Sequence, residues 1–257
     1  MSDRIGEVTA AIERASGQAL CAYVTAGYPT KSVFPEILAA VAASADVVEI
    51  GIPFTDPMAD GLTIQQASHV ALAQGVDLRW ALETVGEAGL ETPVLFMGYY
   101  NPFLAFGLER LVAGMTETGV AGLIVPDLPV EESGPLAEIL DPDGHGLVQL
   151  VAPTTPEDRL RRLAAASRGF VYAVATTGIT GGSTHFGQAV LDYLDRVKAA
   201  ATLPVLAGFG VRERAQVAGL AGHVDGVVVG SALIDAIDRG DDPASFLADL
   251  RPVSAEA

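Results

Sequence analysis

The sequence predicts an α/β protein whose single domain, residues 1–257, is a (β/α)8 TIM barrel with an extra N-terminal helix and loop or helix insertions. Three observations predict this fold class. Eight short β-rich runs alternate with segments of helical periodicity. Several runs, such as 94–97 and 226–229, are apolar with little alternation, which is typical of parallel strands buried on both faces. Eight β/α units in about 250 residues fit a closed barrel better than an open doubly wound sheet.

The predicted elements follow one another without a linker or low-complexity stretch that would divide two domains. A short N-terminal helix is expected over about 3–16. The expected strands are 20–24, 46–50, 93–97, 121–125, 147–151, 170–174, 203–206 and 225–229. Helical periodicity is clear over 33–41, 108–115 and 190–197, with a further helix near 63–74 and room for an extra loop or helix over 53–62. The turn at 240–243 separates the C-terminal helices, and the tail 253–257 is expected to fray.

Composition excludes several classes of function. The formal net charge is −17, and only two of the basic residues are lysines, Lys31 and Lys198. Because phosphate backbones are bound chiefly through Lys and Arg, so acidic a chain is a poor candidate for binding nucleic acid or anionic membranes. No run approaches the ~20 apolar residues of a membrane span, and the N-terminus has no apolar signal region. We therefore expect a soluble cytoplasmic protein.

The cysteine and histidine content argues against a structural metal. The lone Cys21 excludes an intrachain disulfide and a cysteine cluster, and its strand-like context predicts a small core residue. The histidines, His69, His145, His185 and His223, have no metal-ligand spacing. The sequence thus predicts no metal site.

The segment 47–61 carries the clearest chemical signal. Glu49 stands inside an apolar strand-like run, and Asp60 follows at the end of a loop interrupted by Pro53, Pro57 and Gly61. A carboxylate among β-branched residues is costly to bury unless its environment is used, which points to acid–base chemistry. A structural interpretation also exists, in which Glu49 is an ion-paired barrel carboxylate and Asp60 caps a helix.

Glycines follow the last three predicted strands, at 181–182, 208–210 and 230–231. Glycine lets main-chain N–H groups approach an anion closely, and Gly230-Ser231 opens a helical run whose free N–H groups and dipole would face a phosphate. Phosphates often bind after strands seven and eight of such barrels. Each loop alone could be a plain turn, whereas three in succession favour a phosphate site that needs no cationic side chain.

Six motifs stand in one order over roughly residues 20 to 235: Tyr23-Val24-Thr25-Ala26-Gly27-Tyr28-Pro29, the 47–61 segment, Tyr99-Tyr100-Asn101-Pro102, the 125–132 segment, Thr177-Gly178-Ile179-Thr180-Gly181, and Gly208-Phe209-Gly210 with Gly230-Ser231-Ala232. This series resembles the tryptophan synthase alpha subunit. The resemblance implies a lyase that cleaves indole-3-glycerol phosphate to indole and glyceraldehyde 3-phosphate in tryptophan biosynthesis.

The resemblance also assigns expected roles. Glu49 would protonate C3 of the indole ring and take the proton of the neighbouring glycerol hydroxyl, Asp60 would stabilise the indole N–H, and Tyr172 would help to position substrate. The residues expected to line or close the site are Tyr23, Tyr100, Ile124, Thr180 and Phe209. Those expected to contact phosphate are Gly181, Gly210, Gly230 and Ser231. Asp127 would be a supporting hydrogen-bond partner, and Glu131 and Glu132 would occupy a first helical turn.

A partner is implied as well. By resemblance, the loops 54–60 and 101–106 contact a beta subunit in an α2β2 assembly, with Asp56 and Pro57 at the interface. Pyridoxal phosphate would belong to that partner, so no cofactor is expected in this chain. The apolar residues of 100–106 fit either a binding surface or a loop folded under the barrel rim.

Departures from the family pattern keep alternatives open. Ala175-Thr176-Thr177 stands where many members have a serine followed by a leucine or arginine, which puts in doubt the closure of the loop 176–184, expected to act as a lid. Tyr23 stands where some members have phenylalanine. The alternatives are a stand-alone indole-3-glycerol phosphate lyase and a catalytically weak regulatory subunit of a beta partner. A different phosphate-binding barrel would leave the Glu49 and Asp60 spacing unexplained.

Overall fold

The strands form a closed parallel barrel. The structure is a computed structural model that describes residues 3–174, 186–208 and 210–251. Within these ranges the strands pair in the order β1-β2-β3-β4-β5-β6-β7-β8, and β8 pairs with β1. Their bounds are β1 Ala19–Thr25, β2 Val47–Gly51, β3 Val94–Met97, β4 Val120–Ile124, β5 Gly146–Val151, β6 Val171–Val174, β7 Val205–Gly208 and β8 Gly226–Val229. The predicted fold class is confirmed.

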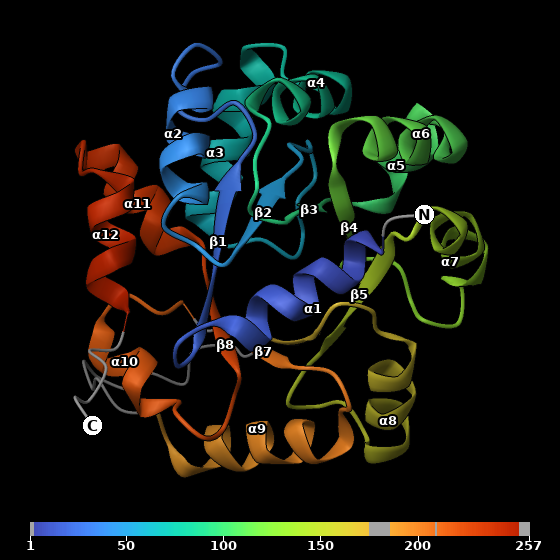
Figure 1. The fold of residues 1–257 in the computed structure, drawn as a ribbon, viewed down its shortest axis with the longest axis vertical. Helices are drawn as coiled ribbons and strands as arrows, with labels where there is room; N and C mark the ends of the chain where they lie inside the picture. Colours follow the sequence, from blue (N-terminus) through green and yellow to red (C-terminus); the bar gives the residue numbers. More distant parts are fainter. Residues whose placement is uncertain (1–2, 175–185, 209, 252–257) are drawn as a thin grey trace.

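Helices surround the strands (Figure 1). Their bounds are α1 Arg4–Arg14, α2 Phe34–Ala42, α3 Leu62–Ala73, α4 Leu78–Ala88, α5 Tyr100–Phe106, α6 Leu108–Thr118, α7 Gly134–Leu140, the 3-10 helix η1 Asp141–Asp143, α8 Glu157–Ala166, α9 Gln188–Ala200, α10 Arg214–Gly219, α11 Ser231–Arg239 and α12 Pro243–Leu250. None of the helices in the described ranges has the length and apolarity needed to cross a bilayer.

Two apolar layers hold the barrel together, because successive strand residues point to opposite faces of the sheet. One layer lies between strands and helices and includes Val48 and Phe96. The other fills the barrel interior and includes Cys21, Leu95 and Val228. Cys21 is fully buried, as the sequence predicts for a small core residue.

Helix α1 closes the amino-terminal end of the barrel. Asp3 caps it by accepting a hydrogen bond from the Gly6 N–H, and its apolar face joins the interior cluster through Ile5 and Val8. A Cβ atom on Gly146 would lie only 2.6 Å from the Ile5 side chain, so the missing side chain makes room for the helix. Figure 1 shows α1 crossing in front of the strands. Because α1 covers the amino-terminal end, the end of the barrel at the carboxyl ends of the strands stays open to form a cavity.

Some boundaries differ from the prediction. Strand β7 begins at Val205 rather than at 203, because Pro204 has no N–H to donate to the ladder. The gap between β2 and β3 holds two helices, α3 and α4, while 53–61 is a loop. The segment 100–106 is the helix α5 rather than a loop, with Phe103 fully buried and Leu104 48% exposed. Its interpretation as a binding surface stays a prediction.

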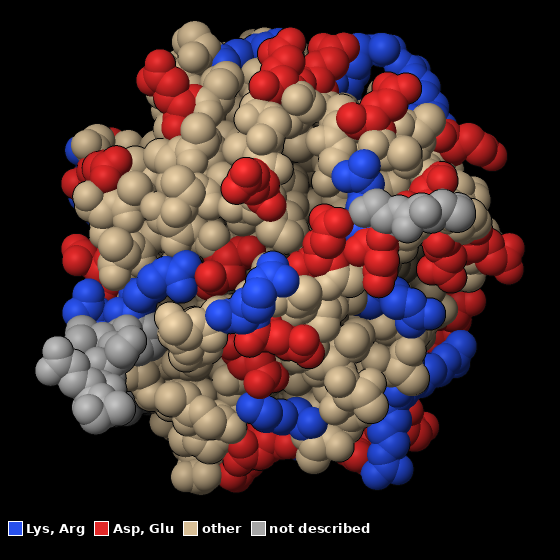
Figure 2. Space-filling view, viewed as in Figure 1, with Lys and Arg blue, Asp and Glu red and all other residues tan. Residues whose placement is uncertain are grey.

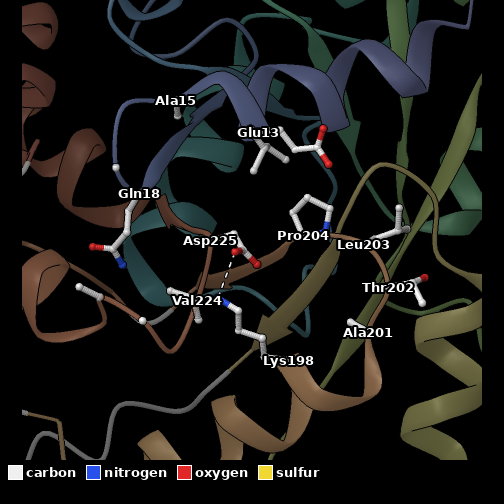
Figure 3. A pocket seen from close by; sticks show the side chains of 14 residues that line it. Glu13, Ala15, Gln18, Lys198, Ala201, Thr202, Leu203, Pro204, Val224 and Asp225 are labelled. Atoms are coloured by element: carbon white, nitrogen blue, oxygen red, sulfur yellow. Dashed lines mark hydrogen bonds and ion pairs between the residues drawn. The ribbon is translucent and has the colours of Figure 1, made fainter.

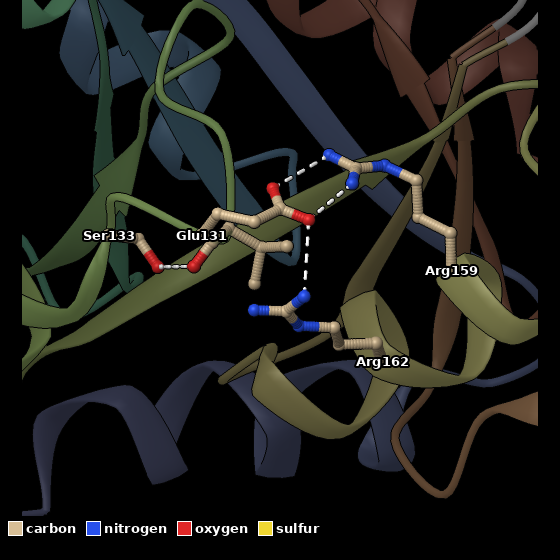
Figure 4. A network of polar contacts seen from close by, with 5 residues as sticks. Glu131, Ser133, Arg159 and Arg162 are labelled. Atoms are coloured by element: carbon tan, nitrogen blue, oxygen red, sulfur yellow. Dashed lines mark hydrogen bonds and ion pairs between the residues drawn. The ribbon is translucent and has the colours of Figure 1, made fainter.

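Glu131 and Glu132 do not occupy a first helical turn, because α7 begins only at Gly134. Glu131 instead receives hydrogen bonds from Arg159 and Arg162 of α8, as Figure 4 shows. These groups are largely exposed, so the network ties the β4–α7 turn to α8 with only a small gain in stability.

On the face shown in Figure 2, acidic and basic side chains are interspersed.

Candidate functional site

A cavity of about 440 Å³ opens at the carboxyl ends of the strands. The described residues that line it come from β1, β2, β3, β5, β6, β7 and β8, from the loops that follow the strands, and from the first turns of α3 and α11. They are Tyr23, Glu49, Ala59, Asp60, Gly61, Ile64, Met97, Pro126, Leu150, Tyr172, Val174, Gly208, Gly210, Val228, Gly230 and Ser231. Its place matches the active face of barrel enzymes of this type. The cavity therefore brings together seven of the predicted site residues: Tyr23, Glu49, Asp60, Tyr172, Gly210, Gly230 and Ser231.

Glu49 is a buried carboxyl group without a hydrogen-bond partner. It sits at the centre of β2, is 0% exposed, and neither side-chain oxygen is hydrogen-bonded within the described residues. Burial, with a smaller contribution from the charge of Asp60, raises the pKa of Glu49 to about 8. Within the described residues Glu49 forms neither a hydrogen bond nor an ion pair, so the ion-paired interpretation is wrong there. Glu49 can hold or release a proton near neutral pH.

Asp60 occupies the loop between β2 and α3 and faces the same cavity. Burial raises its pKa to about 6, and a hydrogen bond from the Tyr99 hydroxyl opposes the shift. The residue that precedes α3 is Gly61, so Asp60 does not cap that helix with its side chain. Two carboxyl groups with different pKa values thus share one cavity, an arrangement that can assign different protonation states to two groups.

Tyr23 and Tyr172 place their hydroxyl groups over glycines of neighbouring strands. A Cβ on Gly51 would lie 2.0 Å from the Tyr23 hydroxyl, and one on Gly208 would lie 2.7 Å from the Tyr172 hydroxyl. Any side chain at either glycine would displace a tyrosine from the cavity wall. Burial raises the pKa of both tyrosines well above the usual range, so both remain neutral. The space for the two rings depends on Gly51 and Gly208.

The part of the cavity wall formed by Gly210, Gly230 and Ser231 offers backbone donors. Gly230 precedes α11, whose first residue, Ser231, also lines the cavity. The first N–H groups of a helix have no intrahelical acceptor and carry the positive end of the helix dipole. Gly210 adopts a positive φ of 64°, which favours glycine. This end of the cavity can bind an anion without a cationic side chain.

The remaining predicted site residues lie elsewhere. Ile124 is fully buried in the barrel interior, and Tyr100 packs on the layer between strands and helices at the start of α5. The Tyr100 N–H donates to the Asp127 carboxylate at 2.9 Å, which gives Asp127 a supporting role at that helix start. Asp56 is exposed and Pro57 is buried, in the loop before Asp60. Thr180, Gly181 and Phe209 lie outside the described residues, as do residues 176–184 of the predicted lid.

Sequence reasoning missed several wall residues. They are Ala59, Gly61, Ile64, Met97, Pro126, Leu150, Val174 and Val228. Most lie at strand carboxyl ends or just after them, so the rule that the active face lies there could have found them. Alternation along β6 also relates Val174 to Tyr172 on the same face. Their apolar side chains supply a surface that suits a flat aromatic group.

A second cavity, of about 710 Å³, lies at the other end of the barrel between α1 and the starts of β7 and β8 (Figure 3). Its charged groups include Lys198 and Asp225, which already form an ion pair at 3.1 Å. Asp225 also accepts a hydrogen bond from the Val205 N–H. Its ion pair supports the strand starts, so we place the candidate site in the smaller cavity with Glu49. Within the described ranges, no three His, Cys, Asp or Glu side chains are arranged to hold a metal ion.

Comparisons with known proteins agree on one family. The family model "Tryptophan synthase alpha chain" matches residues 9–255. A relative of that name from Roseiflexus sp. (strain RS-1) is 42% identical over 249 residues, which are 95% of each chain. One from Solidesulfovibrio magneticus is 42% identical over 98% of each chain.

Solved structures give the same result. Tryptophan synthase from M. tuberculosis in an open form has a TM-score of 0.85 at 35% identity, covering 97% of this chain and 98% of that one. A tryptophan synthase complex from Pyrococcus furiosus has a TM-score of 0.82 at 36% identity, covering 91% and 98%. The chain therefore belongs to the tryptophan synthase alpha chain family, and it is a lyase that cleaves indole-3-glycerol phosphate in tryptophan synthesis.

Proposed function

We propose that Glu49 is the general acid and base of this cleavage. The observation that carries the proposal is a fully buried carboxyl group that faces the cavity, lacks a hydrogen-bond partner among the described residues, and has a pKa of about 8. Below that pH the group is mostly protonated. A protonated carboxyl group in the cavity can donate a proton to the substrate and then accept one.

The proposed steps conserve atoms and charge. The Glu49 carboxyl group gives its proton to C3 of the indole ring, which makes the ring an electron sink. The resulting carboxylate takes the proton from the glycerol hydroxyl next to the bond that breaks. The electrons of that carbon–carbon bond pass to the ring, releasing indole and glyceraldehyde 3-phosphate. Glu49 ends the cycle protonated, ready for the next substrate.

Asp60 is proposed to accept a hydrogen bond from the indole N–H and to stabilise the positive charge that develops on nitrogen. With a pKa of about 6, it is mostly ionised at neutral pH, as this role requires. Tyr172 is proposed to position substrate beside Glu49. The substrate phosphate would bind at Gly210, Gly230 and Ser231, where the N-terminus of α11 meets the cavity.

The remaining roles assigned by family resemblance stay proposals. Ile124 and Tyr100 would support the substrate-binding wall from behind, and Thr180, Gly181 and Phe209 would complete it. A beta chain would bind the rim in an α2β2 assembly, near Asp56 and Pro57, and would hold the pyridoxal phosphate. Three of the exposed large apolar side chains lie in this region, Met58, Leu62 and Leu104, which supports a partner surface.

Glu49→Gln tests the acid–base proposal. The amide keeps nearly the same shape but cannot exchange a proton, so cleavage should fall by at least about 1,000-fold while substrate affinity changes little. Indole release and substrate binding are measured separately, with and without a beta chain. Turnover like that of the native chain in the glutamine variant would rule the mechanism out.

A further inference from the structure

Asp235 lies on α11, one helical turn after Ser231, whose backbone the proposed function assigns to the substrate phosphate. Residues four apart in an α-helix share one face, and each Cα–Cβ bond tilts toward the helix N-terminus. The Asp235 side chain therefore leans toward the end of α11 that meets the cavity. A negative charge at this place would oppose phosphate binding unless another group offsets it.

The Asp235 carboxylate accepts hydrogen bonds from two other segments. Its Oδ1 atom accepts from the Thr63 hydroxyl at 3.3 Å, and its Oδ2 atom accepts from Nη1 of Arg212 at 2.8 Å. Thr63 is in the first turn of α3, and Arg212 is in the loop between β7 and α10. These donors are 172 and 23 residues away in the sequence, so one side chain joins three segments that only the fold brings together.

Both of these segments also supply residues to the cavity wall. The chain leading into α3 and the first turn of that helix supply Asp60, Gly61 and Ile64. The β7–α10 loop supplies Gly210, two residues before Arg212. The carboxylate on α11 is thus bonded to two segments that share the cavity wall with the N-terminus of its own helix.

Each joined part is fixed by contacts of its own. The N–H groups of Arg212 and Glu213 donate to Oε1 of Gln216 at 2.7 and 3.1 Å, which holds the loop to α10. Helix α11 is held by buried apolar residues such as Leu233 and Ile234, and it packs against α3 (Figure 1). A bond between anchored parts sets the distance between them.

We infer that Asp235 is a positioning residue for the phosphate end of the site, which holds the β7–α10 loop and the start of α3 in place beside the N-terminus of α11. The inference rests on the proposed phosphate site at Gly210, Gly230 and Ser231. The charge of Arg212 also offsets that of Asp235. Neither of these two side chains is among the described residues that line the cavity, so Asp235 acts through the backbone donors and not by touching the substrate.

The exposure of the ion pair separates this role from a general effect on stability. The Asp235 side chain is 28% exposed and that of Arg212 is 54% exposed. Such a pair contributes little to the free energy of unfolding. Hydrogen bonds from backbone N–H groups to a phosphate, however, weaken steeply as their distance and angle depart from the optimum. Loss of Asp235 should therefore affect phosphate affinity more than it affects folding.

Asp235→Ala removes both hydrogen-bond acceptors. We expect KM for indole-3-glycerol phosphate and the inhibition constant of glyceraldehyde 3-phosphate to rise about fivefold. The value of kcat and the inhibition constant of indole, which has no phosphate, should change less than about twofold, because phosphate contacts are the same in the ground state and the transition state. Removal of a negative charge without any change of position would act in the opposite direction and lower the constants of both phosphorylated ligands.

Asp241→Ala is the matched control. The Asp241 carboxylate pairs at 2.8 Å with Arg239, the last residue of α11, so this variant makes the same change in net charge at the far end of the helix. It should leave all four constants unchanged. A native or lower inhibition constant of glyceraldehyde 3-phosphate in the folded Asp235→Ala protein would overturn the inference, as would an equal change for indole.

Thr63→Val is a second variant that changes no charge. It keeps the shape of the side chain and removes one of the two donors, so the inhibition constant of glyceraldehyde 3-phosphate should rise about twofold. Thermal unfolding shows whether each protein is folded at the assay temperature. If Asp235→Ala is not folded there, Thr63→Val decides the question, and native inhibition in that variant counts against the inference.

Ser231→Asp separates the inference from the proposed function. A carboxylate at the first residue of α11 suits the helix dipole but would repel a phosphate at that end of the cavity. If inhibition by glyceraldehyde 3-phosphate stays native in this variant, the proposed phosphate site fails and the inference fails with it. If Ser231→Asp weakens this inhibition and Asp235→Ala does not, the phosphate site stands and the inference alone fails. Weaker inhibition in both variants supports both.

Discussion

Glu49 lowers the stability of the fold and at the same time supplies a group suited to acid–base chemistry. Its carboxyl group is buried between apolar strands and has no hydrogen-bond partner within the described residues. A buried polar group in that state destabilises the fold. Its pKa of about 8 is the physical consequence, and it keeps a proton available at neutral pH. Buried ionisable groups with strongly shifted pKa values are typical of functional sites.

The pH profile of kcat should be bell-shaped. Glu49 must begin the cycle protonated, so activity should fall as pH rises through about 8. Asp60 must be ionised, so activity should also fall as pH drops through about 6. Steady-state indole release over this range measures both limbs. A rate that keeps rising above pH 9 would contradict the proposed starting state of Glu49.

Glu49→Gln should stabilise the fold, and more so at high pH. The pKa of Glu49 is raised from 4.5 to about 8 by folding, so the native chain loses stability as pH rises through that window. Glutamine does not titrate. The difference in unfolding free energy between variant and native chain should therefore grow by about 4 kcal/mol from about pH 5 to about pH 9. Thermal or urea unfolding at several pH values would detect it, and a constant difference would refute the raised pKa.

At the scale of elements, the two ends of the barrel have different tasks. Helix α1 packs into the amino-terminal end through Ile5, against Gly146 and Gly169, which have no side chains to obstruct it. The carboxyl end carries the cavity with Glu49 and Asp60. Stability at one end is thus separate from chemistry at the other, as is general for this barrel.

Ile5→Ala should reduce stability without changing catalysis. The truncation leaves a cavity under α1 that Gly146 cannot fill, at a cost of about 2–4 kcal/mol, whereas Ile5→Val should cost about 1 kcal/mol. The midpoint of thermal unfolding is expected to fall in that order. The value of kcat at a temperature where all three proteins are folded should stay the same. A large loss of kcat in the folded alanine variant would show that α1 affects the catalytic end.

At the scale of the whole molecule, the acidic net charge is consistent with a cavity that lacks a cationic side chain among its described lining residues. The net charge of −17 makes long basic surfaces scarce, and the cavity accordingly offers backbone N–H groups to a phosphate. The rim near Asp60 exposes Met58 at 87%, Leu62 at 76% and Leu104 at 48%. These exposed apolar side chains lie in the region proposed to contact a beta chain.

Leu104→Lys should weaken the stimulation of indole release by a beta chain. The new charge would have to be desolvated at an apolar interface, so the partner concentration for half-maximal stimulation should rise at least about tenfold. Val70→Lys, at a similarly exposed position on α3, is the matched control and should leave stimulation unchanged. Equal stimulation of both variants would place the contact elsewhere.

The barrel and most of its strands could be predicted from sequence, because buried parallel strands and amphipathic helices leave periodic patterns. Helix α5 was missed, since its apolar residues follow no clear period and its start is supported by Asp127, which is distant in sequence. The candidate carboxylates Glu49 and Asp60 could be found because charged or loop residues interrupt an apolar run. The stacking of Tyr99 on Phe54 could not be predicted, because it joins two segments that are distant in sequence.

The sequence by itself determined the fold class, the order of the strands and the residues with chemical potential, because these depend on local patterns and on motifs. Only the tertiary structure decided which of them meet. Closure of the barrel brings Tyr23, Glu49 and Tyr172 to one cavity. It also raises the pKa of Glu49, because the burial of this residue and its proximity to Asp60 arise only on folding. The role of Gly51 and Gly208, which leave space for the hydroxyls of Tyr23 and Tyr172, likewise depends on the folded structure.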